Sequence, residues 1–317
     1  MDLSVIIPAY RASGTLKTAL ASILEKQDTK REYEVLLVLS PSDDGSLALA
    51  KEMEKDHENL RIIELEEVTP ANVARMKGVE LAKAELVSFM DADDEARPNY
   101  VEDFCAAFEK EKEADIVVGG FAICSKKKHT RTYILSVSRN VPGEKALRIF
   151  FHDLSIRGFM WNKAYRKSLF DKRPLIYLSD PEDLFEDEAL NLSLFYFARR
   201  VITFRKPVYV YHKDNEKSLT SAKRFERAKK ELLFFAAGRE FLSKMGNEKL
   251  LRHYLASLKF RRFWLSYDLS FDKKNGKGKD YVKQVKKEYR TICDIKKPLD
   301  KENASYSAAL SRALLDQ

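Results

Sequence analysis

Short apolar runs of strand length alternate with amphipathic segments along the first ninety residues of the chain. The apolar runs, rich in Val, Ile and Leu, are residues 3–7, 33–39, 60–65 and 86–90. The segments with apolar side chains at helical spacing are residues 16–24, 47–53 and 70–83. Nearly continuous apolar strands separated by helices are typical of a parallel sheet covered on both faces. The pattern predicts an α/β fold, with a Rossmann-like, mostly parallel sheet flanked by helices and joined by right-handed crossovers.

The later part of the chain changes character. A helix is expected from Pro98 to about residue 112, followed by a hairpin of strands at 116–123 and 132–137, and by further helices at 143–152 and 184–197. Residues 201–212 read as a strand pair, or as one bent strand interrupted at a proline. From about residue 222 the pattern is helical to the end. We therefore expect two domains, residues 1–221 and a helical C-terminal region of residues 222–317.

Composition places the chain among ordinary globular proteins, with 44% hydrophobic and 33% charged residues. No apolar run reaches the ~18 residues that a membrane span needs, and the sequence opens directly on a strand without a signal peptide. Three widely spaced cysteines form neither a disulfide framework nor a zinc pattern. We expect a reduced, cytoplasmic protein.

The net charge of +8 is concentrated in one segment. Residues 1–220 carry 33 Lys and Arg against 37 Asp and Glu, whereas residues 221–290 carry 20 against 8. Aromatic residues interleave with this basic segment, as on helices that rest on anionic bilayers, although such a stripe also fits a core or a dimer contact. The asymmetry indicates a surface that attaches to something anionic, namely membrane lipid headgroups, a polyanionic glycan or nucleic acid, or else a solvated surface without a partner. Peripheral contact of residues 222–317 with the inner face of an anionic membrane is the expected interaction. A nucleic-acid binder is not expected, because no recognition helix or aromatic platform is apparent.

Three carboxylates follow the fourth predicted strand: Asp91, Asp93 and Asp94. Ligands of open α/β sheets bind beyond the carboxyl ends of the strands. Two carboxylates spaced i, i+2 in a turn can converge on one Mg²⁺ or Mn²⁺ ion, since both prefer oxygen ligands. The alternative is an acidic helix start, in which Asp93 or Asp94 caps the next helix.

Several motifs in order give the chain a resemblance to the family-2 glycosyltransferases of the GT-A fold, the type that builds bacterial cell-surface polysaccharides. The segments that carry the resemblance read S-V-I-I-P-A-Y, A-R-M-K-G, F-M-D-A-D-D, W-N-K, F-E-D-E and P-V-Y-V-Y-H followed by S-L-T, at residues 4–10, 74–78, 89–94, 161–163, 185–188, 207–212 and 218–220. The match spans roughly residues 3–221, about two-thirds of the chain. The resemblance implies transfer of a sugar from a nucleotide-diphosphate donor, with UDP-sugar expected.

The resemblance assigns roles to the three acids. In the family the second acid of the D-x-D motif binds the metal directly, so Asp93 is the expected first ligand of Mn²⁺ or Mg²⁺. Asp91 then faces the ribose or a metal-bound water. Asp94 contacts the donor sugar or caps the following helix.

A catalytic base is expected in the acidic stretch 180–188, because the acceptor hydroxyl must lose a proton. Chemistry alone leaves six candidates there: Asp180, Glu182, Asp183, Glu186, Asp187 and Glu188. The family pattern points to Asp187, with Glu186 beside it binding or orienting the acceptor. The alternative is a charged helix start that the helix dipole favours.

Four further positions have two interpretations each. His212 reaches the metal or diphosphate, or it is a structural residue at a strand end. Arg75 contacts the diphosphate or shapes the pocket, or it is a surface arginine. Trp161 and Asn162 line the acceptor pocket, or Trp161 is buried in the core.

One departure from the family pattern concerns the second strand, which the family follows with two acids. An ungapped alignment puts Leu39 and Ser40 at those positions. Ser40 can still hydrogen-bond the edge of a uracil base. The backbone of Pro8, Ala9 and Tyr10 can supply further donor contacts.

The expected function is therefore that of a metal-dependent inverting glycosyltransferase. It would move a sugar from a nucleotide-diphosphate donor to a hydroxyl of a glycan or lipid-linked acceptor. The lost acidic pair keeps one alternative open, a catalytically degenerate nucleotide-sugar or glycan-binding protein of the same fold.

Overall fold

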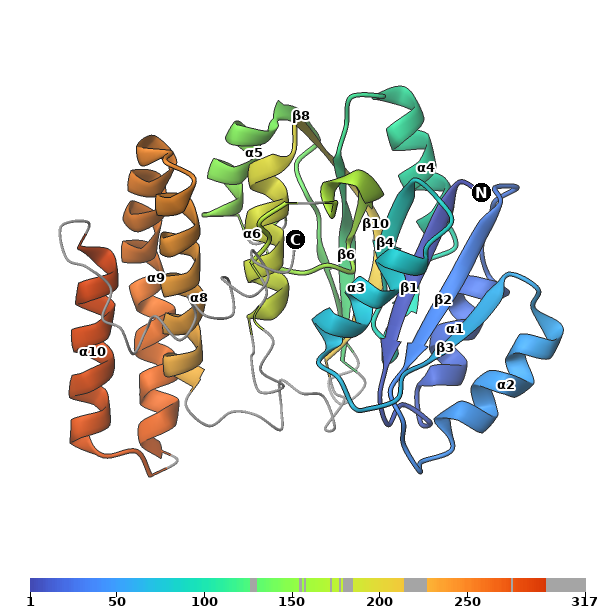
Figure 1. Ribbon diagram of the computed structural model, residues 1–317, viewed down its shortest axis with the longest axis horizontal. Coiled ribbons are helices and arrows are strands. Elements are labelled where there is room, and N and C mark those ends of the chain that lie inside the picture. The colour runs from blue at the N-terminus through green and yellow to red at the C-terminus, as the bar shows by residue number, and fades with distance from the viewer. Residues whose placement is uncertain are drawn as a thin grey trace. The chain divides into compact units, whose positions relative to one another are not determined.

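The computed structural model in Figure 1 describes most of the chain, in two packing units. The described residues are 1–125, 130–153, 156, 158–171, 173–176, 178, 185–213, 227–274 and 276–294. The first unit contains the described residues of 1–146, 159–173 and 195–213. The second contains those of 147–158, 174–194 and 227–294. The predicted boundary at residues 221 and 222 lies outside the described residues, so the division into 1–221 and 222–317 stays a prediction.

A single ten-stranded sheet organises the first unit, in the order β3-β2-β1-β4-β9-β6-β10-β5, with β7 paired to β6 and β8 to β10. The strands are β1 (Leu3–Ala9), β2 (Tyr33–Leu39), β3 (Leu60–Glu64), β4 (Leu86–Phe89), β5 (Glu95–Ala96), β6 (Ile116–Ser125), β7 (Thr130–Ile134), β8 (Arg139–Pro142), β9 (Lys163–Arg166) and β10 (Arg200–His212). Strands β3, β2, β1 and β4 pair in parallel, as do β6 and β10. The predicted α/β fold with a mostly parallel N-terminal sheet is confirmed.

Helices join the parallel strands and cover the sheet (Figure 1). In the first unit they are α1 (Leu16–Leu24), α2 (Ser46–Asp56), α3 (Ala71–Leu81) and α4 (Tyr100–Lys110), with a 3₁₀ turn at Lys167–Leu169. Two further helices, α5 (Gly143–Phe150) and α6 (Glu186–Phe197), each have residues in both units. Strand β1 is buried along almost its whole length because helices pack on both of its faces, which explains its uninterrupted apolar sequence. Helix α3 approaches β1 closely at Gly78, where an added Cβ would lie 2.4 Å from Ile6.

Three short strands of the sheet, β5, β8 and β9, were not predicted from the sequence. Strand β9 inserts antiparallel between β4 and β6, where no strand was expected. Of the two interpretations of residues 201–212, the single strand interrupted at Pro207 is confirmed, because residues 200–212 form one strand with a register shift around Pro207. Proline cannot donate to the ladder, so the irregularity falls where the backbone lacks an N–H group.

Three helices, α8 (Arg227–Lys244), α9 (Glu248–Lys274) and α10 (Lys279–Cys293), lie side by side in the second unit (Figure 1). Their apolar sides form a core in which Phe234, Phe235 and Phe241 are no more than 1% exposed. These aromatic residues are therefore core residues, one of the interpretations open for the stripe. Among the described residues, no helix has the length and apolar character to cross a bilayer.

Candidate active site

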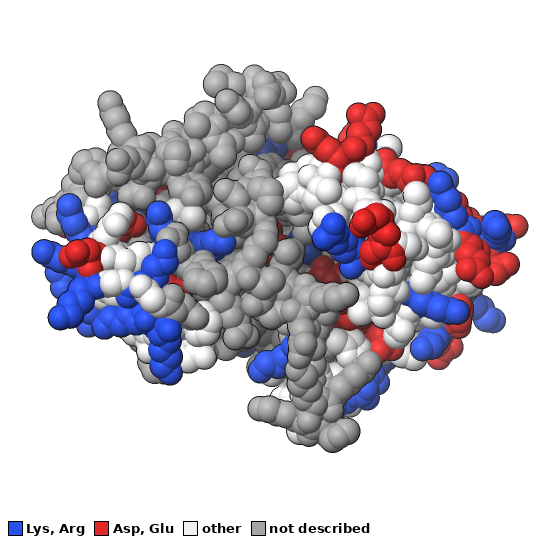
Figure 2. All heavy atoms as spheres, turned by 90° about the horizontal axis from the view of Figure 1, so that it is seen from below, with Lys and Arg blue, Asp and Glu red and all other residues white. Residues whose placement is uncertain are grey.

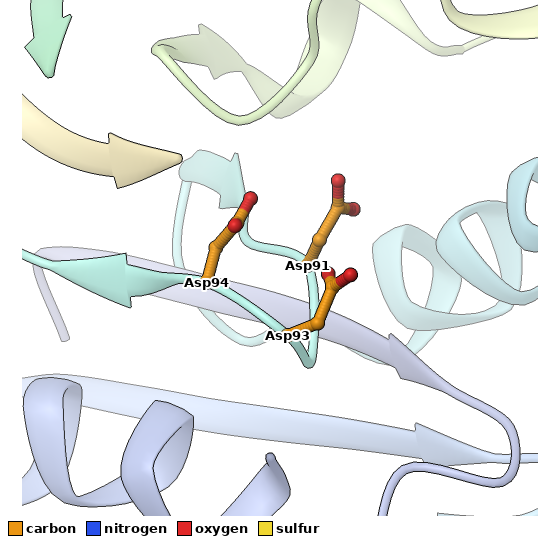
Figure 3. A group of neighbouring side chains, drawn as sticks. All are labelled: Asp91, Asp93 and Asp94. Atoms are coloured by element: carbon orange, nitrogen blue, oxygen red, sulfur yellow. The ribbon is translucent and has the colours of Figure 1, made fainter. Parts of the chain in front are cut away.

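The three acids that follow β4 lie together on one turn. Figure 3 shows the side chains of Asp91, Asp93 and Asp94 extending to the same side of the chain. One oxygen from each carboxylate can be chosen so that all three lie within 4.8 Å of one another. The turn is anchored to the sheet because the Met90 N–H donates to the carbonyl of Ile6 on β1, at 3.0 Å. Parallel pairing therefore delivers the acids to the carboxyl edge of the sheet, where the sequence predicted a ligand site.

Asp94 is fixed by strand β10 and not by a helix. One of its oxygens accepts a hydrogen bond from the Tyr209 hydroxyl at 2.9 Å, and the other accepts from the His212 N–H at 2.8 Å. The residue is 1% exposed. Helix α4 begins later, at Tyr100 after Asn99, so Asp94 does not cap it. The helix-cap interpretation of Asp94 is wrong, and its donor contact stays a prediction.

The carboxylates repel one another. Burial raises the pKa of Asp94 well above its usual value, and the charges of Asp93 and Asp91 raise that pKa further. The hydrogen bonds from His212 and Tyr209 oppose this rise without cancelling it. Three clustered oxygen donors whose like charges repel are a donor set that suits a hard divalent cation. The residues present therefore fit Mn²⁺ or Mg²⁺.

Arg75, on helix α3, contacts this cluster through Asp91. Its guanidinium donates to a carboxylate oxygen of Asp91 at 2.8 Å, and the arginine is only 3% exposed. The surface-arginine interpretation is therefore wrong. The ion pair orients Asp91, whose side chain keeps 29% of its surface exposed. A diphosphate contact of Arg75 stays a prediction.

The ends of β1 and β2 lie at the same edge of the sheet. Ala9 and Leu39 are paired in parallel register, and the Ser40 N–H donates to the Ala9 carbonyl at 2.9 Å. The Ser40 hydroxyl accepts from the Thr69 N–H at 3.3 Å and the residue is 2% exposed. Tyr10 is 44% exposed. The structure thus gathers Pro8, Ala9, Tyr10 and Ser40 at one edge, and their donor-binding roles stay predictions.

Asp44 ties together the two loops at this edge. It accepts hydrogen bonds from the Ser13 N–H and the Ser46 hydroxyl, each at 2.9 Å, and from the Ser42 hydroxyl at 2.8 Å. Although its partial burial works the other way, these hydrogen bonds lower the pKa of Asp44 below its usual value. Asp44 therefore stays charged and holds the loop after β2 against the loop after β1.

The His212 side chain has a carboxylate partner. Its Nε2 atom lies 2.8 Å from a Glu95 oxygen, and the two side chains are 20% and 30% exposed. Within the described residues, the cluster of candidate metal ligands comprises the three aspartates. The predicted metal contact of His212 stays a prediction, and the structure adds that a carboxylate orients the imidazole ring.

Trp161 is buried in a stack of aromatic rings. Its indole lies parallel to the rings of Phe159 at 4.6 Å and Tyr209 at 4.5 Å, and it is 3% exposed. Of its two interpretations, the structure favours burial in the core. Asn162 is fully buried, donates to the Gly119 carbonyl at 3.0 Å and accepts from Lys163 at 2.9 Å. Their acceptor-pocket role stays a prediction.

The predicted catalytic base lies in the second unit. Glu186 and Asp187 occupy the first turn of α6 and are half-buried. Glu188 is buried and accepts two hydrogen bonds from Arg261, at 2.7 and 3.0 Å, so it is not free to act as a base. The other three acidic candidates, Asp180, Glu182 and Asp183, lie outside the described residues, as does the S-L-T segment at 218–220. The assignment of Asp187 stays a prediction.

Sequence reasoning missed two residues of this site. Tyr209 connects the acid turn to β10, since its hydroxyl also accepts from the Asp91 N–H at 3.0 Å. Glu95 holds the His212 ring. The one signal present was the alternation Tyr209-Val210-Tyr211, which puts both tyrosines on one face of a strand that ends at His212. The contact of Tyr209 with the acid turn was not apparent from the sequence, because the turn and β10 are far apart along the chain.

Comparison with known proteins agrees with this geometry. The family model described as Glycosyl transferase family 2 matches residues 4–173. The putative glycosyltransferase EpsH of Bacillus subtilis is 27% identical over 212 residues, which are 66% of this chain and 60% of EpsH. The poly(ribitol-phosphate) beta-N-acetylglucosaminyltransferase TarP of Staphylococcus aureus is 25% identical over 174 residues, which are 55% of this chain and 51% of TarP. The chain thus matches only about half to three-fifths of the length of these relatives.

The fold also resembles a solved structure. Residues 1–349 of TarS from S. aureus, crystallised in complex with UDP-GlcNAc, superpose with a TM-score of 0.61 at 19% identity. The superposition covers 92% of this chain and 90% of the TarS chain. This likeness confirms the predicted GT-A fold. The family model spans more than half of the 317 residues of this chain. The chain therefore belongs to Glycosyl transferase family 2.

Proposed function

We propose that this chain is a metal-dependent, inverting glycosyltransferase that moves a sugar from a UDP-sugar to a hydroxyl group of a cell-surface glycan or a lipid-linked acceptor. The observation that carries the proposal is the cluster of Asp91, Asp93 and Asp94 at the carboxyl edge of the parallel strands. The complex of TarS with UDP-GlcNAc supports the choice of donor. The name of TarP supports a polymeric cell-wall acceptor.

In this proposal Asp93 and Asp91 hold the cation, and Arg75 fixes the carboxylate of Asp91. A bound Mn²⁺ or Mg²⁺ ion supplies positive charge for the departing diphosphate. Tyr209 and the His212 backbone keep Asp94 in place and so hold the turn that presents Asp93. Ser40 and the loop after β1 border the space for the nucleotide.

Asp187 acts as the general base. It takes the proton from the acceptor hydroxyl while that oxygen forms a bond to the anomeric carbon of the donor sugar. The bond from the anomeric carbon to the diphosphate breaks, and UDP leaves with the bonding electrons. One displacement of this kind inverts the anomeric configuration. The "beta" in the name of TarP is consistent with inversion, since UDP-GlcNAc is an α-linked donor.

Release of UDP from a panel of UDP-sugars, with and without Mn²⁺, tests the proposal. We expect turnover that EDTA abolishes and Mn²⁺ restores, and a loss of roughly 100-fold or more in Asp187→Asn. The matched control is Asp171→Asn, an exposed acid of the sheet unit, which should keep full turnover. Tight UDP binding without any turnover would contradict the enzyme proposal and favour the degenerate binding protein.

We also propose that the C-terminal helices contact an anionic membrane by charge alone. In their described residues, helices α8 to α10 expose thirteen Lys and Arg side chains and only two Asp or Glu side chains. Figure 2 shows Lys and Arg gathered at the left, where these helices lie. The aromatic residues Phe234, Phe235 and Phe241 are buried in the helical core, whereas Tyr267 is 60% exposed.

Such a surface attracts phospholipid headgroups without inserting into the acyl region. Co-sedimentation with vesicles containing phosphatidylserine, but not with neutral vesicles, is the expected result, and ~0.5 M salt should release the protein because it screens exposed charges. A triple variant Lys283→Glu, Lys286→Glu and Lys287→Glu on α10 should lose this binding. Retention of the variant on the anionic vesicles would overturn the membrane contact.

A further inference from the structure

We propose that Arg261, on helix α9, is a positioning residue for the predicted base, holding the first turn of α6 through Glu188. This inference rests on the proposed function, because it gives the C-terminal helices a part in the same reaction. It assigns to residues 222–317 a role other than surface attachment. Every contact involved lies within the second unit.

Two contacts bracket Glu186 and Asp187. Before them, the ring of Phe185 stacks on Phe234 of α8, with centroids 6.2 Å apart and an interplanar angle of 20°. After them, the Glu188 carboxylate accepts two hydrogen bonds from the Arg261 guanidinium, at 2.7 and 3.0 Å. The residues on either side of the predicted base are thus anchored to the same pair of helices.

The position of these anchors on α6 matters because a helix start is not held by its own hydrogen bonds. The first intrahelical bond here runs from the Ala189 N–H to the Phe185 carbonyl, at 2.9 Å. The first-turn N–H groups of any helix lack such partners. Side-chain anchors at Phe185 and Glu188 therefore decide how rigidly Asp187 is presented.

Arg261 is itself held in place. It is 7% exposed, and its guanidinium carbon lies 5.1 Å from the Phe234 ring centroid and 5.2 Å from that of Phe235. Contact with aromatic rings of this kind suits a planar guanidinium better than an ammonium group. The arginine therefore gives α6 a rigid attachment point.

A second buried acid does not compete strongly for this arginine. Glu231 is 2% exposed, and burial raises its pKa to about 8 even though Arg261 lowers it. At neutral pH Glu231 is therefore mainly protonated, which leaves Glu188 as the charged partner of Arg261.

The experiment compares Arg261→Met with a control variant that takes the arginine partner from another buried carboxylate in the same helices. Arg227 on α8 lies 3.0 Å from Asp268 on α9, and that aspartate side chain is 4% exposed. Arg227→Met leaves a buried carboxylate without this partner, and the ion pair that it breaks joins α8 to α9 and does not include α6. Both variants should lower the melting temperature. Only Arg261→Met should lower kcat, by roughly 10- to 100-fold, with the donor KM little changed, since small misplacements of a reacting group have effects of this size.

Two further variants separate position from stability. Glu188→Gln combined with Arg261→Met removes both charges, so the melting temperature should recover while kcat stays low. Arg261→Lys should restore part of the lost kcat, because it keeps a charge for Glu188 but loses the planar contact with the rings. Recovery of kcat together with stability in the double variant would overturn the proposal, as would an equal loss of kcat in Arg227→Met.

Amide hydrogen exchange gives a readout that does not depend on turnover. In Arg261→Met the amides of residues 189–192 should exchange faster than in Arg227→Met. Equal exchange in the two variants would refute the anchor itself. Faster exchange combined with full turnover in Asp187→Asn would keep the anchor but refute the base assignment, and with it the catalytic consequence of Arg261.

Discussion

Each unit of this protein contains a group of carboxylates, and the two groups differ in what surrounds them. At the sheet edge, Asp91, Asp93 and Asp94 lie within 4.8 Å of one another, and Asp93 and Asp91 raise the pKa of Asp94. In the second unit, Glu188 on α6 and Asp268 on α9 each face an arginine, at 2.7 and 3.0 Å. In the first group one carboxylate, Asp91, is paired with Arg75, and repulsion between like charges remains around Asp94. In the second group both carboxylates are paired with an arginine.

The neighbours of a carboxylate decide whether it can serve a cation. A buried carboxylate paired with an arginine is already compensated, and removing the arginine leaves a costly buried charge. Carboxylates that repel one another at the edge of a sheet gain most when a cation binds, because the cation removes the repulsion. Acid content alone therefore does not identify a cation site.

Asp93→Asn tests the first half of this comparison and should have the largest effect. Turnover with Mn²⁺ should fall on the order of 10²- to 10³-fold, because metal-ion catalysis contributes several kcal/mol. The free energy of unfolding should stay the same or rise, since one of three repelling charges is removed. Activity assays and urea denaturation measure the two quantities. Asp43→Asn, whose side chain is 93% exposed at the same edge, is the control. A large loss of stability in Asp93→Asn would mean that Asp93 is stabilised by opposite charge, as Glu188 and Asp268 are.

Glu231→Gln tests the second half of this comparison, the buried acids near arginines, through the pH dependence of stability. The folded-state pKa of Glu231 is about 8, above its ordinary 4.5, so between these values the folded protein binds the extra proton. Its contribution to stability is therefore fully present below pH 4.5 and is lost as the pH rises through about 8. Glutamine mimics the protonated acid. The variant should be more stable than the wild type at pH 8 by on the order of a few kcal/mol, and nearly equal at pH 5.

Urea denaturation at pH 5, 7 and 8 measures this difference. The control is Glu248→Gln, an exposed acid at the start of α9, which should show no pH-dependent gain. A wild-type stability that does not fall between pH 5 and pH 8, relative to Glu231→Gln, would show that Arg261 compensates this acid as well.

The sequence predicted the sheet edge well because the signal there is local. An apolar strand followed at once by acids, as at Asp91 and Asp93, indicates both the strand and its candidate ligands within a few residues. Parallel pairing then brings Ala9 and Ser40 to the same edge without further information. The predicted parallel α/β sheet and the acid cluster both followed from this, whereas the GT-A assignment came from the family resemblance.

The contacts that fix the acids were not predictable, because they join residues that are distant in sequence. Tyr209 lies 118 positions from Asp91, and Arg261 lies 73 positions from Glu188. Neither pairing leaves a pattern in a single sequence. The insertion of β9 between β4 and β6 was missed for the same reason, since four residues, Lys163–Arg166, give little periodicity. Tertiary pairing, and not local propensity, decides such elements.

Tyr209→Phe tests the comparison at the level of one hydroxyl group, and its effect should be the smallest of the three. The variant keeps the ring that stacks on Trp161 at 4.5 Å but removes the donor to Asp94 and the acceptor for the Asp91 N–H. Leaving buried polar groups without partners should lower the free energy of unfolding by about 1–2 kcal/mol. Tyr10→Phe, which changes a tyrosine that is 44% exposed, should have almost no effect on stability.

The same variant should also weaken the cation site, because the Tyr209 hydroxyl orients the turn that presents Asp93. Groups that orient metal ligands typically change metal affinity by about 10- to 100-fold. The Mn²⁺ concentration for half-maximal turnover should therefore rise by roughly tenfold, while saturating Mn²⁺ restores most of the rate. A loss of stability with an unchanged Mn²⁺ requirement would mean that Tyr209 supports the fold alone. The three acids would then keep their arrangement without the Tyr209 hydroxyl. The backbone of the turn, and not this hydrogen bond, would determine the geometry of the cation site.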